Sequence, residues 1–203
     1  MAVMSVSLPL PVTGGDACER ADAARNRLRI LAAAARLIGE QGVEQVSMDA
    51  IAAEAGVGKG TLFRRFGDRG GLMHALLDER ERELQDEIIR GAPPLGPGAP
   101  AVERIVAFGR RLIEHLEQSG DLLFAAERGT RLASPVYLFY RTHMVGLVRD
   151  ADPDADAEYL ADVLLAPLAA DLHLYLRRAR ELSADRAADA YEELVRRVLR
   201  ATD

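Results

Sequence analysis

The chain has 203 residues, enough for one sizeable core or for a small domain joined to a larger one. It is 49% hydrophobic and 29% charged, an ordinary soluble composition, and no apolar run approaches the ~18 residues that a membrane-spanning helix needs. Cys18 is the single cysteine, which excludes an internal disulfide and favours a reducing cytoplasm. We therefore predict a soluble, cytoplasmic protein with no membrane partner.

The net charge of −6 is unevenly distributed along the chain. Residues 25–74 hold eight Lys and Arg against five Asp and Glu, a charge of +3, which leaves −9 for the rest. The one lysine of the chain, Lys59, lies in this basic segment. A basic segment beside an acidic body is compatible with nucleic-acid binding, which the net charge alone would disfavour.

The N-terminal region predicts an unstructured arm followed by a first helix. Residues 1–24 are mildly apolar at the start, lack an initial cationic region, and carry Pro9 and Pro11. They are therefore predicted to form a disordered arm rather than a signal peptide. Residues 25–41 are predicted to form a helix that Gly42 ends, with an apolar stripe made by Leu28, Leu31, Ala35 and Ile38.

The stretch GVGKGTLFRRF, residues 56–66, decides between two kinds of site. A phosphate-binding loop needs Gly-x4-Gly-Lys-[Ser/Thr] between a strand and a helix, but here the glycine spacing differs and MDAIAAEA precedes it. Ser47 is a good N-cap for a helix over 48–55, and a second short helix follows over about 59–66. Two short helices joined at Gly56 predict a helix-turn-helix over about 47–66.

Within this motif the apolar and cationic residues separate onto different sides. Val57, Leu62 and Phe66 are predicted to fill the small core. The side chains left outward on the second helix are those of Lys59, Thr61, Arg64 and Arg65, with Gly60 among them. In a helix-turn-helix the second helix enters the major groove with its N-terminal residues at the base edges.

The rest of the chain continues in helical periodicity. Residues 91–100, GAPPLGPGAP, break the chain, because four prolines and three glycines cannot continue a helix. A fourth helix is expected to start at GDRGG and to be solvated along DERERELQDE, and a fifth has an apolar stripe from Val102 to Leu116. Further helices are expected over 121–128, 135–148, 159–182 and 185–201. Pro167 is expected to bend the helix over 159–182, and Ser183 to cap the last one. No strand pattern is present, so the predicted class is all-α with about nine helices.

Residues 25–77, with GVEQVSMDAIAAEAGVGKGTLFRRFGDRGGLMHALL, resemble the DNA-binding domain of the TetR family of bacterial transcriptional regulators. The resemblance implies a three-helix N-terminal DNA-binding domain and a larger helical domain, residues 78–203, for ligand binding and dimerisation. It places Lys59, Gly60 and Arg64 at base-contacting positions. It places Ser47, Met48, Thr61, Phe63, Arg65 and Arg69 at phosphate-contacting positions.

Three positions depart from the family pattern. Gly58 stands where a Ser or Thr cap is usual, and Phe63 stands where Tyr is usual. Asp49 lies where some members contact bases, and its carboxylate could only accept from cytosine or repel phosphate. These departures bear on operator sequence and affinity, and they give slight support to a helical protein that no longer reads DNA. Phe63 is equally compatible with burial and with exposure.

The resemblance also implies a homodimer in which 159–182 and 185–201 form a four-helix bundle with the partner's copies. A symmetric pair would read a palindromic operator in double-stranded DNA. Packing of both helices on their own core is the alternative.

Aromatic residues gather beyond position 100, where they fit either an apolar ligand cavity or an ordinary core. The candidate pocket residues are Phe108, His115, Phe124, Arg128, Tyr137, Tyr140, His143 and Tyr175. A metal site from His115, His143 and His173 is disfavoured, because the three residues lie on separate helices with no ligand-like spacing. We expect no metal and no cofactor.

The predicted function is sequence-specific transcriptional regulation, by a repressor that a small-molecule effector releases from its operator. No catalytic constellation stands out, so we do not expect an enzyme. The alternative is an all-helical interaction or small-molecule-binding protein whose helix-turn-helix has lost DNA binding.

Overall fold

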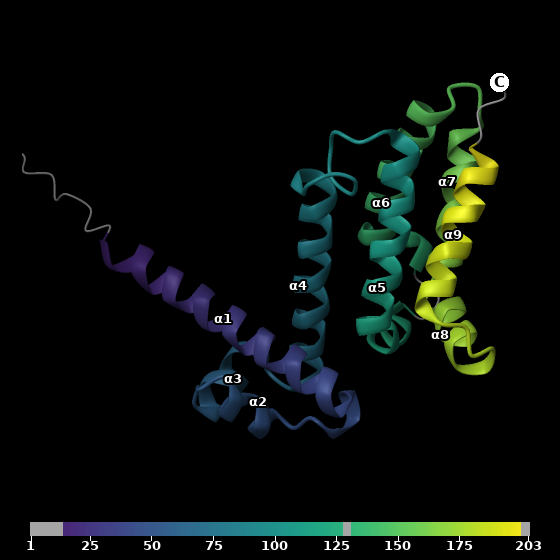
Figure 1. The fold of residues 1–203 in the computed structure, drawn as a ribbon. Helices are drawn as coiled ribbons and strands as arrows, with labels where there is room; N and C mark the ends of the chain where they lie inside the picture. The colour runs from purple at the N-terminus through teal and green to yellow at the C-terminus, as the bar shows by residue number, and fades with distance from the viewer. Residues whose placement is uncertain (1–13, 128–130, 200–203) are drawn as a thin grey trace, which may run out of the picture. The chain divides into compact units, whose positions relative to one another are not determined.

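The computed structural model describes residues 14–127 and 131–199, and within these ranges it contains α-helices and short 3-10 helices without a strand (Figure 1). The predicted all-α class is confirmed. Contacts divide the chain into one unit that ends at Leu72 and a second unit that begins at Met73, and each unit is described by itself.

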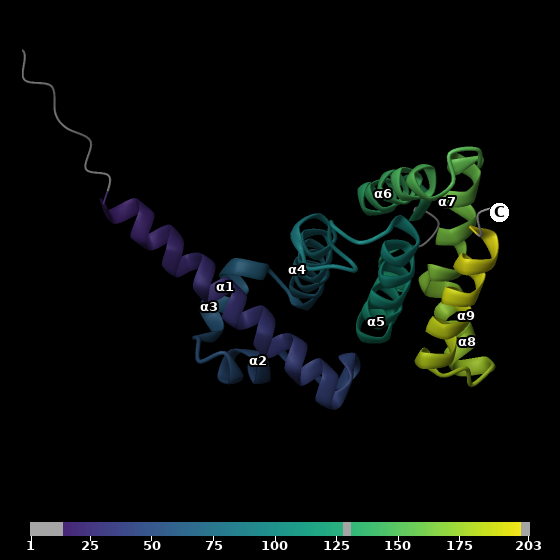
Figure 2. The ribbon, with the colours of Figure 1, turned by 45° about the horizontal axis from the view of Figure 1, so that its top comes forward.

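The first unit contains α1 (Gly14–Gln41), the 3-10 helix η1 (Val43–Gln45), α2 (Met48–Glu54), α3 (Lys59–Phe66) and the start of α4 (Arg69–Arg90) (Figure 2). Ser47 caps α2 as predicted, since its hydroxyl accepts a hydrogen bond from the Ala50 amide at 3.1 Å. Arg29 of α1 donates to the carbonyl of Ala55 at 2.8 Å, which links α1 to the end of α2.

Two predictions about α1 are wrong. Residues 14–24 are helical rather than part of a disordered arm, because an alanine-rich stretch without proline extends the helix back to Gly14. Residues 1–13 lie outside the described ranges. Leu28 is 50% exposed and does not belong to the core. The buried face of α1 is rotated from the predicted stripe and consists of Ile30, Leu31, Ala33, Ala34, Leu37 and Ile38.

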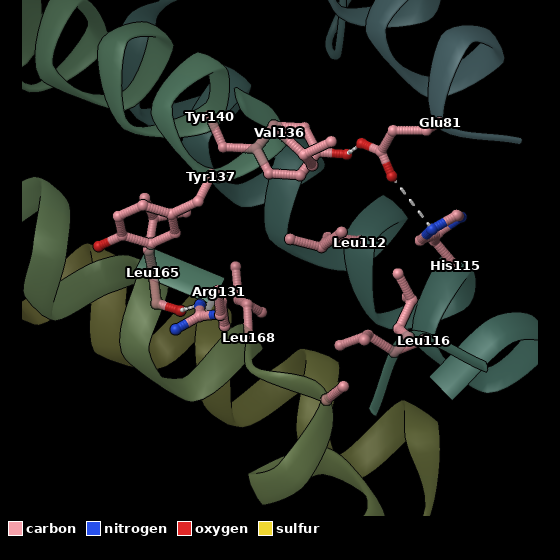
Figure 3. Close-up of a pocket in the computed structure, with 12 residues that line it drawn as sticks. Glu81, Leu112, His115, Leu116, Arg131, Val136, Tyr137, Tyr140, Leu165 and Leu168 are labelled. Atoms are coloured by element: carbon pink, nitrogen blue, oxygen red, sulfur yellow. Dashed lines mark hydrogen bonds and ion pairs between the residues drawn. The ribbon is translucent and has the colours of Figure 1, made fainter. Parts of the chain in front are cut away.

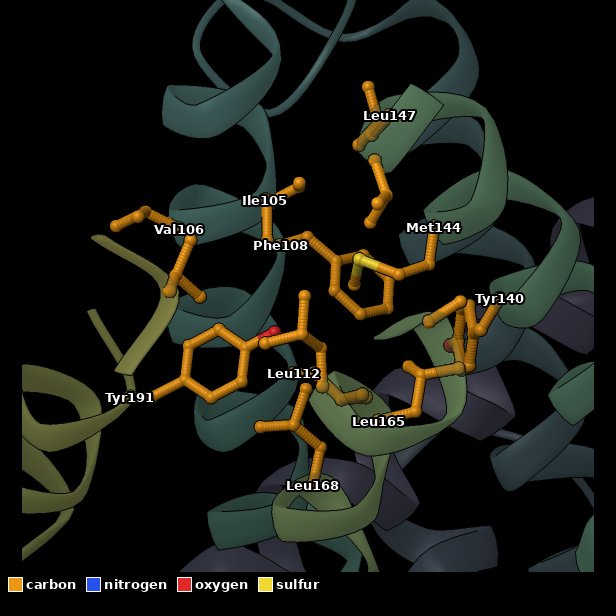
Figure 4. Close-up of a cluster of buried hydrophobic side chains, with 14 of the residues drawn as sticks. Ile105, Val106, Phe108, Leu112, Tyr140, Met144, Leu147, Leu165, Leu168 and Tyr191 are labelled. Carbon is orange, nitrogen blue, oxygen red and sulfur yellow. The ribbon is translucent and has the colours of Figure 1, made fainter. Parts of the chain in front are cut away.

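The second unit is a bundle centred on α5 (Ala101–Glu127), which packs against α6 (Pro135–Ala151), α8 (Ala170–Ala179) and α9 (Ala184–Val198). Its other elements are η2 (Arg131–Ala133), α7 (Ala157–Leu165), which packs on α6, and η3 (Ala166–Leu168). Phe108 and Leu112 of α5 lie among the buried side chains of Met144, Leu165 and Tyr191 (Figure 4). The loop before α5 begins where the Pro- and Gly-rich break was predicted.

The boundaries of two predicted helices in this unit are wrong. Residues 121–127 continue α5 instead of forming a helix of their own. Gly120 is helical and lies close to α8, since a Cβ added at this position would be 3.3 Å from the Leu174 side chain. Residues 159–182 do not form one bent helix. Pro167 lacks an amide donor and lies in η3, which separates α7 from α8 with a bend of about 40°.

The last helix confirms its predicted cap, because the Ser183 hydroxyl accepts from the Arg186 amide at 3.2 Å. Among the described helices, no single one is long and apolar enough to cross a membrane. Only the bent pair Ala157–Leu168 and Ala170–Ala179 passes that test, on length and composition alone.

Candidate nucleic-acid interface and helical-domain cavity

The turn between α2 and α3 depends on glycine. Gly56 has φ of +62°, a conformation that side-chain-bearing residues rarely adopt, and the Val57 amide then donates to the Ala52 carbonyl at 3.0 Å. Leu62 and Phe66 of α3 are buried together with Ile51 of α2. This packing fixes α3 along one side and leaves its other side outward.

The outward side of α3 carries the residues predicted to contact DNA. Lys59, Gly60, Arg64 and Arg65 are exposed, and Thr61 is half-buried. Phe63 is 45% exposed, which answers the question that the sequence left open about its burial. A cationic surface on a short helix suits the phosphates and base edges of a duplex groove.

The cations of this surface differ in the hydrogen bonds and ion pairs that they form within the protein. Lys59 forms an ion pair with Asp49 of α2, and Arg65 donates to the carbonyl of Ala23 in α1. Arg64 makes no hydrogen bond or ion pair with any described residue. Its five N–H donors are therefore the most available on α3.

The two glycines at the start of α3 are not required by packing. A Cβ added at Gly58 or at Gly60 would meet no atom within 4 Å. Gly58 is the N-cap and provides no side-chain cap, as its residue type predicts. A bare backbone at Gly60 is consistent with close approach by an external surface.

The three remaining predicted contact residues lie at helix starts. Ser47 is exposed while it caps α2, and Met48 is half-buried beside it. Arg69, also half-buried, donates to the Val43 carbonyl at the start of α4. A guanidinium has further donors, so this bond leaves Arg69 able to contact phosphate as well.

The second unit encloses a cavity of about 40 Å³ between α4, α5, α6 and η3 (Figure 3). Three of the predicted pocket residues line it, namely His115, Tyr137 and Tyr140. Leu112, Leu116, Leu165 and Leu168 supply much of its apolar wall. The sequence did not assign a role to Glu81 or Arg131, which also line it.

The other predicted pocket residues that the structure describes do not line this cavity. Phe108 is fully buried in the core, where it meets Tyr140 edge to face with ring centroids 5.2 Å apart. Phe124 and Tyr175 are 51% and 52% exposed, because each lies on the outer side of its helix. His143 packs against Phe108, and Arg128 lies outside the described residues.

Glu81 belongs to the run DERERELQDE, which was predicted to be solvated, yet it is only 8% exposed. Its position relative to Leu84 and Ile88, three and seven residues later, places it on the buried stripe of α4. That spacing was the available signal, and the surrounding charges obscured it.

Burial, together with the nearby positive charge of Arg104, lowers the pKa of His143 to about 4. The folded state therefore binds fewer protons than the unfolded state between pH 6.5 and 4. We expect the free energy of unfolding to fall as the pH drops through this range.

Urea unfolding at several pH values checks this expectation. The variant His143→Phe should lose part of the pH dependence, whereas His74→Gln, at an exposed site, should retain it. Equal slopes for His143→Phe and the native chain would contradict the assignment.

Within the described ranges, no three or more His, Cys, Asp or Glu residues are grouped so that they could hold a metal ion. His173 has a different partner: its Nε2 lies 2.7 Å from Glu117, which also accepts from Arg177.

Comparison with known proteins agrees with this architecture. Residues 30–76 match the model of the bacterial regulatory proteins of the tetR family. A helix-turn-helix transcriptional regulator of Staphylococcus aureus is 47% identical over 58 residues, which cover 29% of this chain and 31% of that protein. The match therefore spans about a third of the length of this curated relative.

Solved structures extend the likeness to most of the chain. A TetR regulator from Streptomyces coelicolor is 27% identical with a TM-score of 0.57, covering 83% of this chain and 97% of that one. A transcriptional regulator from Saccharomonospora viridis, solved in complex with choline, is 21% identical with a TM-score of 0.66, covering 85% and 96%. Residues 30–76 therefore match the DNA-binding domain of the TetR family, and the chain as a whole is similar in fold to TetR-family regulators.

Proposed function

We propose that the chain is a dimeric transcriptional repressor that reads a palindromic operator with α3 and leaves it when a small molecule binds the second unit. The observation that carries the DNA-binding role is the outward cationic side of α3, on which Arg64 has no partner among the described residues. The family match over residues 30–76 supports the same role. We also propose that the protein is cytoplasmic and has no enzymatic activity.

Dimerisation is proposed through α8 and α9. Leu172 and Tyr175 of α8 are 38% and 52% exposed, and a groove of about 200 Å³ runs between α5, α8 and α9. Apolar side chains left outward on α8, together with this groove beside α9, suit a two-fold seam. Light scattering should give the mass of two chains, and Tyr175→Glu should shift it towards one.

The test of DNA binding begins with selection of a preferred duplex from a random library. Affinity for that duplex is then measured by gel shift at several salt concentrations. Six to eight phosphate contacts per dimer should give a slope of about −5 to −7 on logarithmic axes. A selection that enriches no sequence, with a flat salt dependence, favours the alternative of a helical protein that has lost DNA binding.

Asp49→Asn is expected to raise the affinity for every duplex by roughly twofold to fivefold per half-site, the scale of an exposed ion pair. The carboxylate of Asp49 neutralises Lys59 in the free protein and repels phosphate. Fluorescence anisotropy with the selected and a scrambled duplex measures both affinities. Lys59→Gln should change them in the opposite direction.

If Asp49→Asn instead weakens only the selected duplex, Asp49 acts as an acceptor from a base such as cytosine.

A further inference from the structure

The cavity of the second unit has one polar end, formed by side chains from three helices. Glu81 of α4, His115 of α5 and Tyr140 of α6 are 8%, 2% and 5% exposed. The Tyr140 hydroxyl donates to Glu81 Oε1, and His115 Nε2 lies 3.5 Å from Glu81 Oε2 without forming a hydrogen bond to any described residue (Figure 3).

The buried carboxylate of Glu81 can accept more hydrogen bonds than it receives. A carboxylate offers about four lone-pair sites, and Glu81 receives one hydrogen bond, from Tyr140. An ionised carboxylate inside a protein is costly unless a positive charge and further donors compensate it. Among the described residues, no Lys or Arg side chain is paired with Glu81, and the nearby His115 ring forms no hydrogen bond to it.

The opposite end of the cavity has a different character. Arg131 donates to the Leu165 carbonyl at 3.0 Å and lies 5.0 Å from the centre of the Tyr137 ring. Its guanidinium disfavours a second positive charge at that end. Between the two ends the wall is mainly leucine, with the Tyr137 and Tyr140 rings beside it.

We propose that this cavity binds a small apolar monoamine in its protonated form. The ammonium group donates to Glu81 Oε2, and the hydrocarbon body lies along Leu112, Leu116, Leu165 and Leu168. An ammonium ion provides both the missing charge and the missing donors, whereas an alcohol provides a donor alone and a carboxylate is repelled. As an effector the amine would act through the proposed regulatory function, but its binding does not depend on DNA.

The size of the cavity limits the ligand. At about 40 Å³ it holds roughly three water-sized probes, far below the ~300 Å³ typical of drug-sized sites. n-Propylamine, with four heavy atoms, suits this volume and is protonated at pH 7.5, because alkyl ammonium groups titrate near the lysine value of about 10.4. 1-Propanol and propionate are matched neutral and anionic compounds.

The experiment measures binding of these three compounds to the full chain by saturation-transfer NMR and thermal unfolding, at constant ionic strength and without DNA. n-Propylamine should bind at least ~10-fold more tightly than 1-propanol or propionate, since only the amine can donate to Glu81 with a positive charge. Glu81→Gln, which keeps the shape and an acceptor for Tyr140, should reduce amine binding at least ~10-fold. Glu83→Gln, exposed on the same helix, is the matched control and should bind like the native chain.

Tyr140→Phe is the second variant, and it keeps the carboxylate while removing its present donor. It should retain amine binding, because the ammonium group can take the vacated acceptor site. Equal binding of propylamine and propanol, native amine affinity in a folded Glu81→Gln variant, or no amine binding by the native chain would each overturn the proposal. The first and third comparisons need no variant, so they decide the question even if Glu81→Gln does not fold.

The same samples separate this proposal from the proposed function. If the amine binds but operator affinity does not change, release of the operator by such an effector is contradicted, while the proposed amine site is still supported. If the native chain binds the amine but selects no DNA sequence, the DNA-binding role is contradicted and the amine site is still supported.

Discussion

Replacing Arg64 with alanine is expected to weaken specific DNA binding by roughly 1–3 kcal/mol at each half-site and to relax the preference at one base position. For a symmetric pair of half-sites this amounts to roughly 30-fold to 10⁴-fold in affinity, at about 1.4 kcal/mol per tenfold. The reason is that the Arg64 guanidinium is exposed, has no partner among the described residues, and can donate two parallel hydrogen bonds to guanine.

Two variants separate base contact from general charge loss. Arg69→Ala removes a predicted phosphate contact and should weaken the selected and scrambled duplexes alike. Arg25→Ala removes an exposed cation of α1 that pairs with Asp22, and it should have a small effect on both. Competition gel shifts with single-base operator variants measure the preference, and unchanged specific binding by Arg64→Ala would show that the base contacts are assigned to the wrong residue.

Replacing Gly109 with alanine is expected to destabilise the second unit by roughly 1–3 kcal/mol. The added Cβ would lie 1.9 Å from Cε1 and 2.2 Å from Cδ1 of the Tyr191 ring, so α5 and α9 would have to separate or the ring would have to move. Tyr191 is 4% exposed and belongs to the core cluster, which leaves the ring little space. Urea unfolding followed by circular dichroism measures the change.

Gly146→Ala is the matched control for helix propensity. Gly146 is exposed in α6, and a Cβ there would meet no atom within 4 Å. Alanine at this position should therefore stabilise the fold by about 0.5–1 kcal/mol. If both variants gain stability, the close contact between α5 and α9 is incorrect; if only Gly109→Ala loses stability, Tyr191→Leu in that background should restore part of the loss.

The sequence predicted those elements whose determinants are local. Ser47 and Ser183 cap helices through their own hydroxyl groups, and the Pro- and Gly-rich break before α5 follows from backbone chemistry. The turn at Gly56 and the outward cations of α3 follow from the spacing of glycines, apolar residues and cations within residues 56–66. These features depend on neighbours within a few residues, which a sequence displays directly.

The missed features depend on packing between distant segments. Leu28 fits the predicted stripe but lies outside the packed face of α1. Residues 121–128 were predicted to form a separate helix, whereas α5 continues through Gly120, where the helix lies close to Leu174 of α8. Glu81 becomes a cavity residue only because Tyr140 and His115 come from helices 59 and 34 residues further along the chain.

The open space around Gly58 and Gly60 has a consequence for redesign. Since neither position supports the interior of the domain, both can receive new side chains at little cost to stability, and a serine at position 58 would add a helix cap worth a few tenths of a kcal/mol. Libraries varied at these two sites offer a route to altered operator preference, in which the scaffold is retained and its target sequence is changed.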